Sequence, residues 1–393
     1  MLFPRAPRDL QPNRLTQAVD RARAQGRSLI DLTLTNPTRA GLHYPASLMA
    51  PLGSADALVY DPAPFGLAQA REAVAADYAR RGVAVDPDRI VLTASTSEAY
   101  SLLFKLLCAT SGHEVLVPVP SYPLFDHLTQ LDGVAARPYR LDYHGRWCVD
   151  LPDVDDQWSE ATQAVLAVSP NNPTGSILSA GEWQALAARC AQRHAALIVD
   201  EVFADYPLDD DGGRALASQV LTTEAEGPLT CFLGGLSKSA GLPQVKLGWI
   251  RVDGPDLLVA QALERLELIC DTYLSVATPV QMAAASLIES GAAVRAEILD
   301  RVRTNYAALR IAAARHPAIE VLHAQAGWSA VIRTPATRRE EELVLDLIDR
   351  DGVLVYPGFF FDFPHESFLV VSLLPPPDVF VDGIGHVMER ADV

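Results

Sequence analysis

The sequence predicts an α/β fold in which a large domain, with a mostly parallel sheet covered by helices, is joined to a smaller α+β domain. Three observations support this prediction. Uninterrupted apolar segments alternate with helical patterns from about residue 89 to residue 252, which is typical of a mostly parallel sheet buried on both faces. Beyond Asp256 the pattern changes to long helices followed by short strands. A chain of 393 residues is also long for one domain and comfortable for two.

The N-terminal part is predicted to hold two helices and two turn-rich loops. Apolar residues at helical spacing predict helices over residues 12–25 and 67–81. The short apolar segment 29–34 leads into the first loop, 35–41, and the second loop spans 60–66. Both loops contain proline and glycine, the residues that most often interrupt regular structure.

Strands and helices alternate in the middle of the chain. The predicted strands span residues 89–93, 114–119, 134–141, 164–168, 195–203, 230–234 and 245–252. The predicted helices between them span residues 99–109, a segment that ends near 131, and 179–193. Ligands bind at the carboxyl ends of the strands in such sheets, so polar side chains at these ends are the first candidates for a site.

The C-terminal part is predicted to be rich in helices and to end in an α+β unit. The predicted helices span residues 257–270, 280–289, 293–316 and 340–351, and the predicted strands span 320–322, 328–333, 353–356 and 368–373. We therefore predict three parts. Residues 1–44 form an N-terminal segment that belongs to the small domain as an active-site lid, residues 45–275 form the large ligand-binding domain, and residues 276–393 form the small C-terminal domain.

Composition narrows the class of partner. The formal net charge of −17 argues against nucleic acid and against an anionic membrane. No run of eighteen apolar residues is present, so no transmembrane helix is expected, and the polar start has no apolar signal core. The five cysteines are scattered without a C-x-x-C pair, which favours a reducing compartment, the cytoplasm, and no structural metal site.

A Gly/Ser-rich stretch, residues 234–243, carries Lys238 between two predicted strands. Small side chains leave the backbone there permissive, and a lysine at the edge of a sheet is well placed to form a Schiff base with a carbonyl cofactor. The ordinary alternative is a solvated loop lysine. The stretch is not a phosphate-binding P-loop, because Ser237 and Phe232 stand where that motif needs glycine.

Further polar or aromatic side chains follow the other predicted strands. They are Ser95, Thr96 and Ser97 before a helix, Tyr122 and Asn172 in turns, and Asp200 in the strand 195–203. Taken singly, each has a structural explanation as a helix cap, a cover for the core, a tight turn or a salt bridge. A phosphorylated pyridine aldehyde would use them all: an anion cradle at a helix N-terminus, an aromatic stack, a donor to the phenolic oxygen, a carboxylate on the ring nitrogen and a lysine for the aldehyde.

With these residues the chain resembles the class I/II aminotransferases of the pyridoxal-phosphate fold type I superfamily. The resemblance extends from about Asp31 to Leu374. Its most specific parts are the Asn-Pro-Thr-Gly turn at 172–175, Asp200 with Glu201, and Ser237-Lys238 with Gly248 beyond.

The resemblance implies a role for each residue toward pyridoxal phosphate (PLP). Lys238 would form the Schiff base and shuttle a proton, and Asp200 would keep the ring nitrogen protonated. Asn172 would bond the phenolic oxygen and Tyr122 would stack on the ring. Ser95, Thr96, Ser97, Ser237 and Lys246 would hold the phosphate, and Tyr60 would reach the phosphate of the neighbouring subunit, which implies a homodimer with shared sites.

The chain also departs from the family pattern. Phe203 stands in place of a tyrosine that bonds the phenolic oxygen, and Lys246 in place of an arginine that grips the phosphate in two-pronged fashion. Val370 stands where the resemblance places the arginine for the substrate α-carboxylate. Arg39 is the candidate substitute and Asn36 a weaker one, unless the substrate lacks a carboxylate there.

Further positions with aromatic side chains suggest an apolar pocket wall, although core packing explains most of them as well. These are Trp328, Phe359, Phe360 and Phe361.

The prediction for function is a cytoplasmic, homodimeric PLP-dependent aminotransferase that moves an amino group from an amino acid or amine to a keto acid. The same site chemistry serves a β-eliminating lyase, a racemase or a decarboxylase, because substrate orientation selects the bond that breaks. A non-catalytic, ligand-sensing module on the same fold is the alternative from another class of protein.

Overall fold

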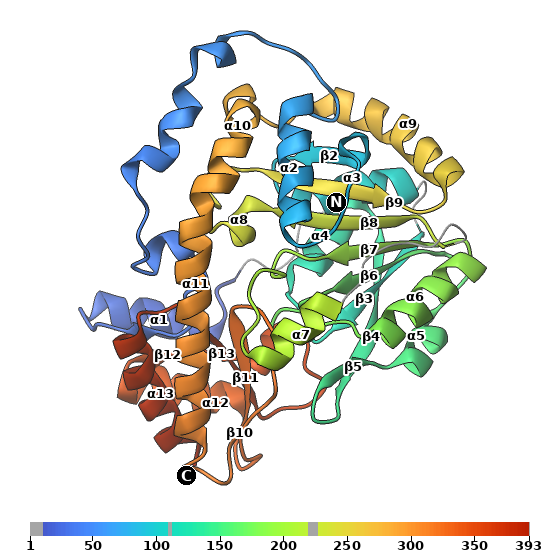
Figure 1. Ribbon diagram of the computed structural model, residues 1–393. Coiled ribbons are helices and arrows are strands. Elements are labelled where there is room, and N and C mark those ends of the chain that lie inside the picture. The colour runs from blue at the N-terminus through green and yellow to red at the C-terminus, as the bar shows by residue number, and fades with distance from the viewer. Residues whose placement is uncertain (1–10, 109–111, 219–226, 393) are drawn as a thin grey trace.

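The computed structural model describes residues 11–108, 112–218 and 227–392, and its centre is an eight-stranded sheet (Figure 1). The strand order is β2-β9-β8-β7-β6-β3-β4-β5. The strands are β2 (Ile90–Thr93), β3 (Glu114–Val119), β4 (Ala135–Tyr143), β5 (Trp147–Val149), β6 (Thr162–Val168), β7 (Ala196–Asp200), β8 (Thr230–Gly235) and β9 (Gly248–Asp253). Neighbours from β8 to β4 run parallel, whereas β9 is antiparallel to both of its neighbours and β5 is antiparallel to β4. The predicted mostly parallel sheet is therefore confirmed.

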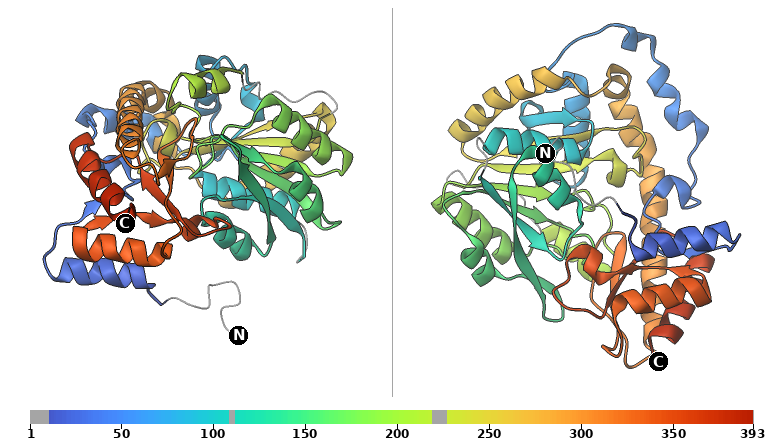
Figure 2. Two further views of the ribbon diagram at one scale, coloured as in Figure 1. Left: turned by 90° about the horizontal axis from the view of Figure 1, so that it is seen from below. Right: turned by 180° about the vertical axis from the view of Figure 1, so that it is seen from behind.

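Helices cover both faces of this sheet (Figure 2). Strand β7 shows how, because its side chains alternate between faces. Ile198 packs in a core cluster with α3 (Thr96–Leu107), α4 (Leu124–Asp132) and α9 (Asp256–Tyr273), and Val199 packs in another with α6 (Ala180–Gln192). All five residues of β7 are buried, which explains the uninterrupted apolar run in its sequence.

A second, antiparallel sheet has the order β10-β11-β14-β13, and a separate parallel pair joins β1 to β12. The strands are β1 (Ile30–Asp31), β10 (Glu320–Val321), β11 (Ser329–Arg333), β12 (Val353–Leu354), β13 (Tyr356–Pro357) and β14 (Phe368–Ser372). The remaining helices near this part are α1 (Arg14–Ala24), α12 (Glu340–Asp346) and α13 (Pro377–Ala391). The N-terminal segment therefore pairs with the C-terminal part, while the predicted domain boundaries stay a prediction. Residues 1–10 of the N-terminal segment and Val393 of the C-terminal domain lie outside the described residues.

Helix α11 (Ala284–Ala313) is 30 residues long and runs past both sheets (Figure 1). It contacts α2 (Ala68–Arg80) beside the large sheet and α13 beside the small one. Its Gly291 faces the segment after β8, where an added Cβ would lie 2.6 Å from the Cβ of Ala240. The close approach needs glycine at this helix position.

Several sequence-based boundaries are wrong, each for a local reason. The stretch with Lys238 is not only a loop, because Leu236–Ser239 forms the short helix α8. The predicted helices 280–289 and 293–316 are instead α10 (Thr278–Met282) and α11, because Gly291 packs inside a helix rather than ending one. Helix α3 begins at Thr96 because Ser95 caps it; its predicted end, Ala109, lies outside the described residues. Helices α5 (Leu151–Gln157), α7 (Asp210–Ser218) and α13 were not predicted.

None of the helices in the described part of the chain has the length and apolar character needed to cross a bilayer.

Candidate active site

The polar residues predicted from the sequence follow strands that run in one direction, so most of them meet at one edge of the large sheet. Asp200 is the last residue of β7, and Lys238 lies in α8 directly after β8. Asn172 follows β6 and Tyr122 follows β3. The turn at Ser95 joins β2 to α3.

The amine of Lys238 lies near two aromatic rings. Its Nζ lies 4.9 Å from the ring centroid of Trp328 and 5.6 Å from that of Phe203. Burial lowers the pKa of the Lys238 amine to about 8, although the negative charge of Asp200 opposes this shift. A larger share of the amine is thus neutral and nucleophilic near neutral pH than for an exposed lysine.

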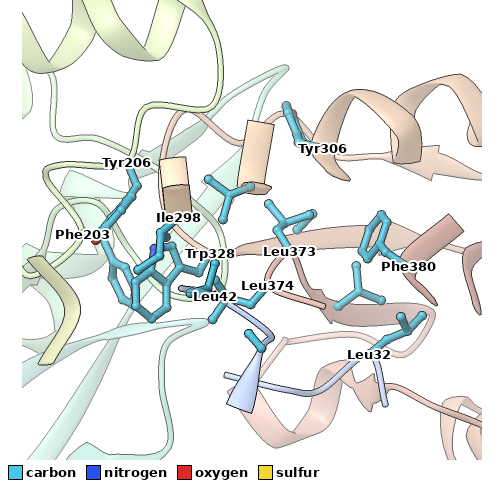
Figure 3. Close-up of a cluster of buried hydrophobic side chains, with 14 of the residues drawn as sticks. Leu32, Leu42, Phe203, Tyr206, Ile298, Tyr306, Trp328, Leu373, Leu374 and Phe380 are labelled. Atoms are coloured by element: carbon cyan, nitrogen blue, oxygen red, sulfur yellow. The ribbon is translucent and has the colours of Figure 1, made fainter. Parts of the chain in front are cut away.

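The turn that carries Lys238 is held from behind by two side chains. The Tyr206 hydroxyl donates to the Lys238 carbonyl at 2.5 Å and lies 3.2 Å from the carbonyl of Ser239. Arg295 Nε, from α11, donates to the Ser239 carbonyl at 2.7 Å. Figure 3 shows Tyr206 beside Phe203 and Trp328 at one end of the core that joins the two sheets. The backbone of the lysine is therefore held by hydrogen bonds, while its side chain contacts the rings of Phe203 and Trp328.

Asp200 is buried and accepts two hydrogen bonds. Tyr100 donates its hydroxyl to Oδ2 at 3.0 Å, and the Val202 backbone N–H donates to Oδ1 at 3.1 Å. Burial raises the pKa of Asp200 to about 6, while these two hydrogen bonds lower it and the neighbouring Glu201 raises it. Glu201 is itself paired with Arg81 Nη2 at 2.9 Å. Asp200 therefore remains an anion at neutral pH inside the protein.

The N-terminus of α3 is the candidate anion site. The Ser95 hydroxyl accepts the Glu98 N–H at 3.2 Å, so this residue is a helix cap, as the structural alternative predicted. Thr96 and Ser97 occupy the first turn of the helix, where backbone N–H groups have no partner within the helix. Gly248, the first residue of β9, packs against this turn, because an added Cβ would lie 3.0 Å from the carbonyl carbon of Ser95.

Asn172 and Tyr122 line a pocket with about 590 Å³ of empty volume. Asn172 Oδ1 accepts a hydrogen bond from the Ser329 hydroxyl at 3.2 Å, which leaves the amide nitrogen to serve as a donor. Tyr122 is half exposed at the rim. Ser329 follows Trp328, one of the two aromatic residues near Lys238, in the chain.

Four other predicted residues, Tyr60, Lys246, Asn36 and Arg39, are not in the lining of this pocket. Tyr60 is 70% exposed and lines a different pocket, with Tyr273. Lys246 is exposed and has a left-handed backbone, with φ at 59°. Asn36 caps the turn Pro37–Arg39 by accepting the Thr38 N–H at 3.0 Å. Arg39 is exposed, and the lining of the pocket includes Thr35 from its loop but not Arg39 itself.

The donor set around Lys238 fits PLP. It combines a buried amine, a buried carboxylate whose two oxygens each keep a free lone pair, an amide, and the N-terminus of a twelve-residue helix, with Ser237 half-buried beside the lysine. The ring of Phe203 packs edge-on against Trp328, with ring centroids 5.4 Å apart. Because this side chain has no polar atom, it offers no hydrogen bond. No cluster of metal-ligating side chains occurs among the residues that the structure describes.

Sequence reasoning missed three supporting residues: Tyr100, Tyr206 and Arg295. Tyr100 lies one helical turn after Thr96, so a search for buried polar residues one turn along α3 could have found it. Tyr206 and Arg295 act on backbone carbonyls, for which their spacing in the sequence offers no signal.

Comparison with known proteins identifies the family of the chain. Residues 57–378 match the model of the family described as aminotransferase class I and II. The chain is 27% identical over 377 residues to the alanine aminotransferase of Mycobacterium tuberculosis (strain ATCC 25618 / H37Rv), covering 91% of this chain and 84% of that protein. It is 25% identical over 380 residues to the glutamate-pyruvate aminotransferase AlaA of Escherichia coli (strain K12), covering 91% and 89%.

Solved structures share the fold. The alanine aminotransferase from Pyrococcus furiosus superposes with a TM-score of 0.84 at 21% identity, covering 95% of each chain. An aminotransferase from Escherichia coli superposes with a TM-score of 0.82, also at 21% identity, covering 98% of each chain.

Proposed function

The chain belongs to the aminotransferase class I and II family and is a PLP-dependent aminotransferase, and on this premise we propose which of its residues carry the reaction. Lys238 is the residue that would hold the cofactor through its aldehyde group. The observation that carries this assignment is the buried amine of Lys238, with its pKa lowered to about 8, in one site with the Asp200 carboxylate. The other roles are argued from where the structure places each side chain.

When bound, PLP supplies a ring that accepts the electron pair released at the substrate carbon. Asp200 would hold the protonated ring nitrogen, and Asn172 would hold the phenolic oxygen through its amide N–H. The Nζ atom of Lys238 would carry the proton that moves during the reaction, because this amine is partly neutral near neutral pH. Tyr122 covers the ring from the rim. Amino groups pass in this way from an amino acid or amine to a keto acid.

The N-terminus of α3 would bind the phosphate. The backbone N–H groups of Thr96 and Ser97, which follow the cap residue Ser95, would donate to it. Ser237 and Lys246 are the further candidates for this group. A helix N-terminus binds phosphate through free N–H groups and the helix dipole.

We propose Arg39 for the carboxylate of the substrate, because Arg39 is exposed on the loop that contributes Thr35 to the pocket lining, although Arg39 does not line the pocket itself. Asn36 positions this loop through its cap. Replacing Arg39 with alanine should raise the KM for a carboxylate substrate, and an unchanged KM would remove Arg39 from the site.

The enzyme is proposed to act as a homodimer with shared sites. Leu58, Val59 and Tyr60 are 88%, 70% and 70% exposed, and a run of such residues is unusual on a surface that meets only water. Tyr60 then reaches the phosphate of the neighbouring subunit. All five cysteines are free, which supports a cytoplasmic location.

The activity is tested with single half-reactions. Purified holoenzyme is mixed with one amino acid or amine at a time, and the absorbance of the lysine-bound cofactor is followed. An aminotransferase loses this band and releases one keto or aldehyde product for each site. Ammonia accumulating while the band persists would instead indicate a lyase and contradict the assignment.

A further inference from the structure

A six-residue segment, 201–206, contacts both ionisable groups of the site. It begins directly after Asp200, the last residue of β7, and its Val202 N–H donates to Asp200 Oδ1 at 3.1 Å. At its other end the Tyr206 hydroxyl donates to the Lys238 carbonyl at 2.5 Å. The position of this one segment therefore affects both the buried carboxylate and the turn that carries the amine.

The segment is neither a helix nor a strand. Two turns shape it, because the Ala204 N–H donates to the Glu201 carbonyl at 3.0 Å and the Tyr206 N–H donates to the Phe203 carbonyl at 3.1 Å. The ring centroid of Phe203 lies 5.6 Å from Lys238 Nζ. A segment without regular structure depends on contacts from neighbouring elements to stay in one place.

Two consecutive arginines at the end of α2 make such contacts. Arg81 Nη2 lies 2.9 Å from Glu201 Oε1, and Arg80 Nη2 lies 2.6 Å from Asp205 Oδ1. Both carboxylates are buried, with side chains that are 2% and 7% exposed. Glu201 is the first residue of the segment and Asp205 is the fifth, so α2 is paired with the segment near both of its ends.

A third arginine joins these ion pairs to α8. Arg295 Nε, from α11, donates to the Ser239 carbonyl at 2.7 Å and lies 3.8 Å from Asp205 Oδ2. Its Nη2 lies 3.5 Å from Asp77 Oδ1, which also accepts from Arg80 Nε at 3.0 Å. Helices α2 and α11 lie in contact (Figure 1). Three arginines and three carboxylates thus form one charge-balanced network around the segment.

Buried ion pairs are a costly way to hold elements together. Removing the charges from water costs free energy that their attraction offsets only with good geometry, and well-packed apolar residues often stabilise a fold as well or better. What arginine pairs add is direction, because the N–H groups of a guanidinium point along fixed lines and so fix where the carboxylate oxygens lie. The guanidinium of Arg81 is itself oriented, since its central carbon lies 4.7 Å from the ring centroid of Tyr78.

We propose that Arg80 and Arg81 are positioning residues, which hold segment 201–206 so that Asp200 and the turn of Lys238 keep a fixed separation. This inference rests on the proposed function, and it adds residues that act through others. Asp200 would hold the ring nitrogen and Lys238 the aldehyde of one rigid cofactor ring, so a shift of the segment misaligns both groups at once. A misplacement of about 1 Å in a site can lower the rate about a hundredfold.

Neutral variants test this proposal. Arg80→Gln and Arg81→Gln each remove one ion pair and keep a polar side chain. In half-reactions of the holoenzyme we expect kcat to fall at least about tenfold, with KM within about twofold of the wild type, since the lost interaction belongs to the transition state. A KM that rises while kcat stays unchanged would overturn the proposal.

Two further readouts do not depend on turnover. The rate at which apoenzyme attaches PLP, followed by stopped-flow absorbance, should fall at least about tenfold in the same variants. PLP is achiral, so its absorption band shows circular dichroism only where the protein holds the ring in one asymmetric setting. The dichroism per bound PLP should therefore decrease at saturating PLP, and unchanged values for both readouts would contradict positioning.

Arg390→Gln is the matched control. Arg390 of α13 pairs with Asp351 through two N–H groups, at 2.9 Å and 2.7 Å. Its side chain is 28% exposed, between the values of 41% for Arg80 and 20% for Arg81. This variant should lower the thermal unfolding midpoint without changing kcat, the attachment rate or the dichroism. An equal loss of kcat in the control would show that a loss of stability alone explains the effect.

Lysine variants separate position from stability. Arg80→Lys and Arg81→Lys keep the charge but lose the planar, directed guanidinium. They should keep the unfolding midpoint of the wild type and still lose part of kcat. These variants also decide the matter if the glutamine variants do not fold, because a wild-type kcat in both lysine variants would overturn the proposal.

Failure of this inference is distinct from failure of the proposed function. If the wild-type protein carries PLP on Lys238 and the variants at residues 80 and 81 behave like Arg390→Gln, the aminotransferase assignment stands and only the positioning role is wrong. If the wild-type protein carries no PLP on Lys238, both fail.

Discussion

At the scale of single residues, the site holds two ionisable groups whose pKa values burial moves toward each other. Burial lowers the pKa of Lys238 to about 8 and raises the pKa of Asp200 to about 6. The charge of Asp200 limits the lowering of the Lys238 pKa. The hydrogen bond from Tyr100 limits the raising of the Asp200 pKa. The result is an amine that is partly neutral and a carboxylate that is charged over the same pH range, as nucleophile and counter-ion require.

The pKa of Lys238 predicts how the apoenzyme takes up PLP. The neutral amine is the reacting form, so below pH 8 the rate of attachment should rise about tenfold for each pH unit and level off above pH 8. An unperturbed lysine would continue to gain rate to about pH 10. Stopped-flow absorbance of apoenzyme mixed with PLP across pH 6–10 measures the profile, and a rise that continues to pH 10 would show that burial does not activate this amine.

Tyr100 is a positioning residue for Asp200. Its hydrogen bond lowers the pKa of Asp200, so Tyr100→Phe should raise that pKa above about 6. The reaction needs the carboxylate as an anion, and activity is lost as pH falls through its pKa. The acidic limb of kcat/KM should therefore move to higher pH in the variant, and the affinity for PLP near pH 6 should fall. Tyr306→Phe is the control, since Tyr306 is also buried but accepts a bond from the Ala324 N–H instead; an equal shift in both variants would exclude a specific effect.

At the scale of elements, the contact between α11 and α8 fixes the turn of Lys238. Arg295 and Gly291 are one helical turn apart on α11, and they meet the segment 239–240 by a hydrogen bond and by close packing. Gly291→Ala should lower the free energy of unfolding by about 1–3 kcal/mol and weaken PLP retention, because the added methyl would press on Ala240. Denaturant unfolding and dialysis against buffer measure the two effects.

The control for this helix glycine is Gly385→Ala on α13. Gly385 is exposed, and an added Cβ there meets nothing within 4 Å. Alanine should stabilise the protein at that site by up to about 1 kcal/mol and leave PLP retention unchanged. A loss of stability at both sites would show that the effect comes from the helix and not from the contact with α8.

The elements also show what the sequence could predict. Strand-end residues such as Asp200 and Asn172 were predictable, because apolar strands and the turns after them are local patterns. Gly291 falls between the predicted helices 280–289 and 293–316 but lies inside α11, since its tertiary neighbour Ala240 is invisible in a local window. The same holds for Tyr206 and Arg295, which act on backbone carbonyls from distant elements.

At the scale of the whole molecule, one chain does not bring Tyr60 to the other site residues. Tyr60 lies with Leu58 and Val59 in an exposed apolar run, and a second subunit is the proposed cover. Leu58→Asp should convert the homodimer to a monomer and weaken PLP binding, because each site loses the residue contributed by its neighbour. Sedimentation or light scattering measures the mass. Ile311→Asp is the control, since Ile311 is 62% exposed at the far end of α11; a monomeric wild-type protein with full activity would contradict the shared site.

The central claim is that Lys238 bonds the cofactor, and the chain allows a decisive measurement because its lysines are Lys105, Lys238 and Lys246 alone. The holoenzyme is reduced with borohydride, digested, and analysed by mass spectrometry to locate the pyridoxyl group. The account predicts one modified peptide, the one that contains Lys238, and none in a Lys238→Ala variant. A pyridoxyl group on Lys105 or Lys246, or on no lysine, would contradict the account.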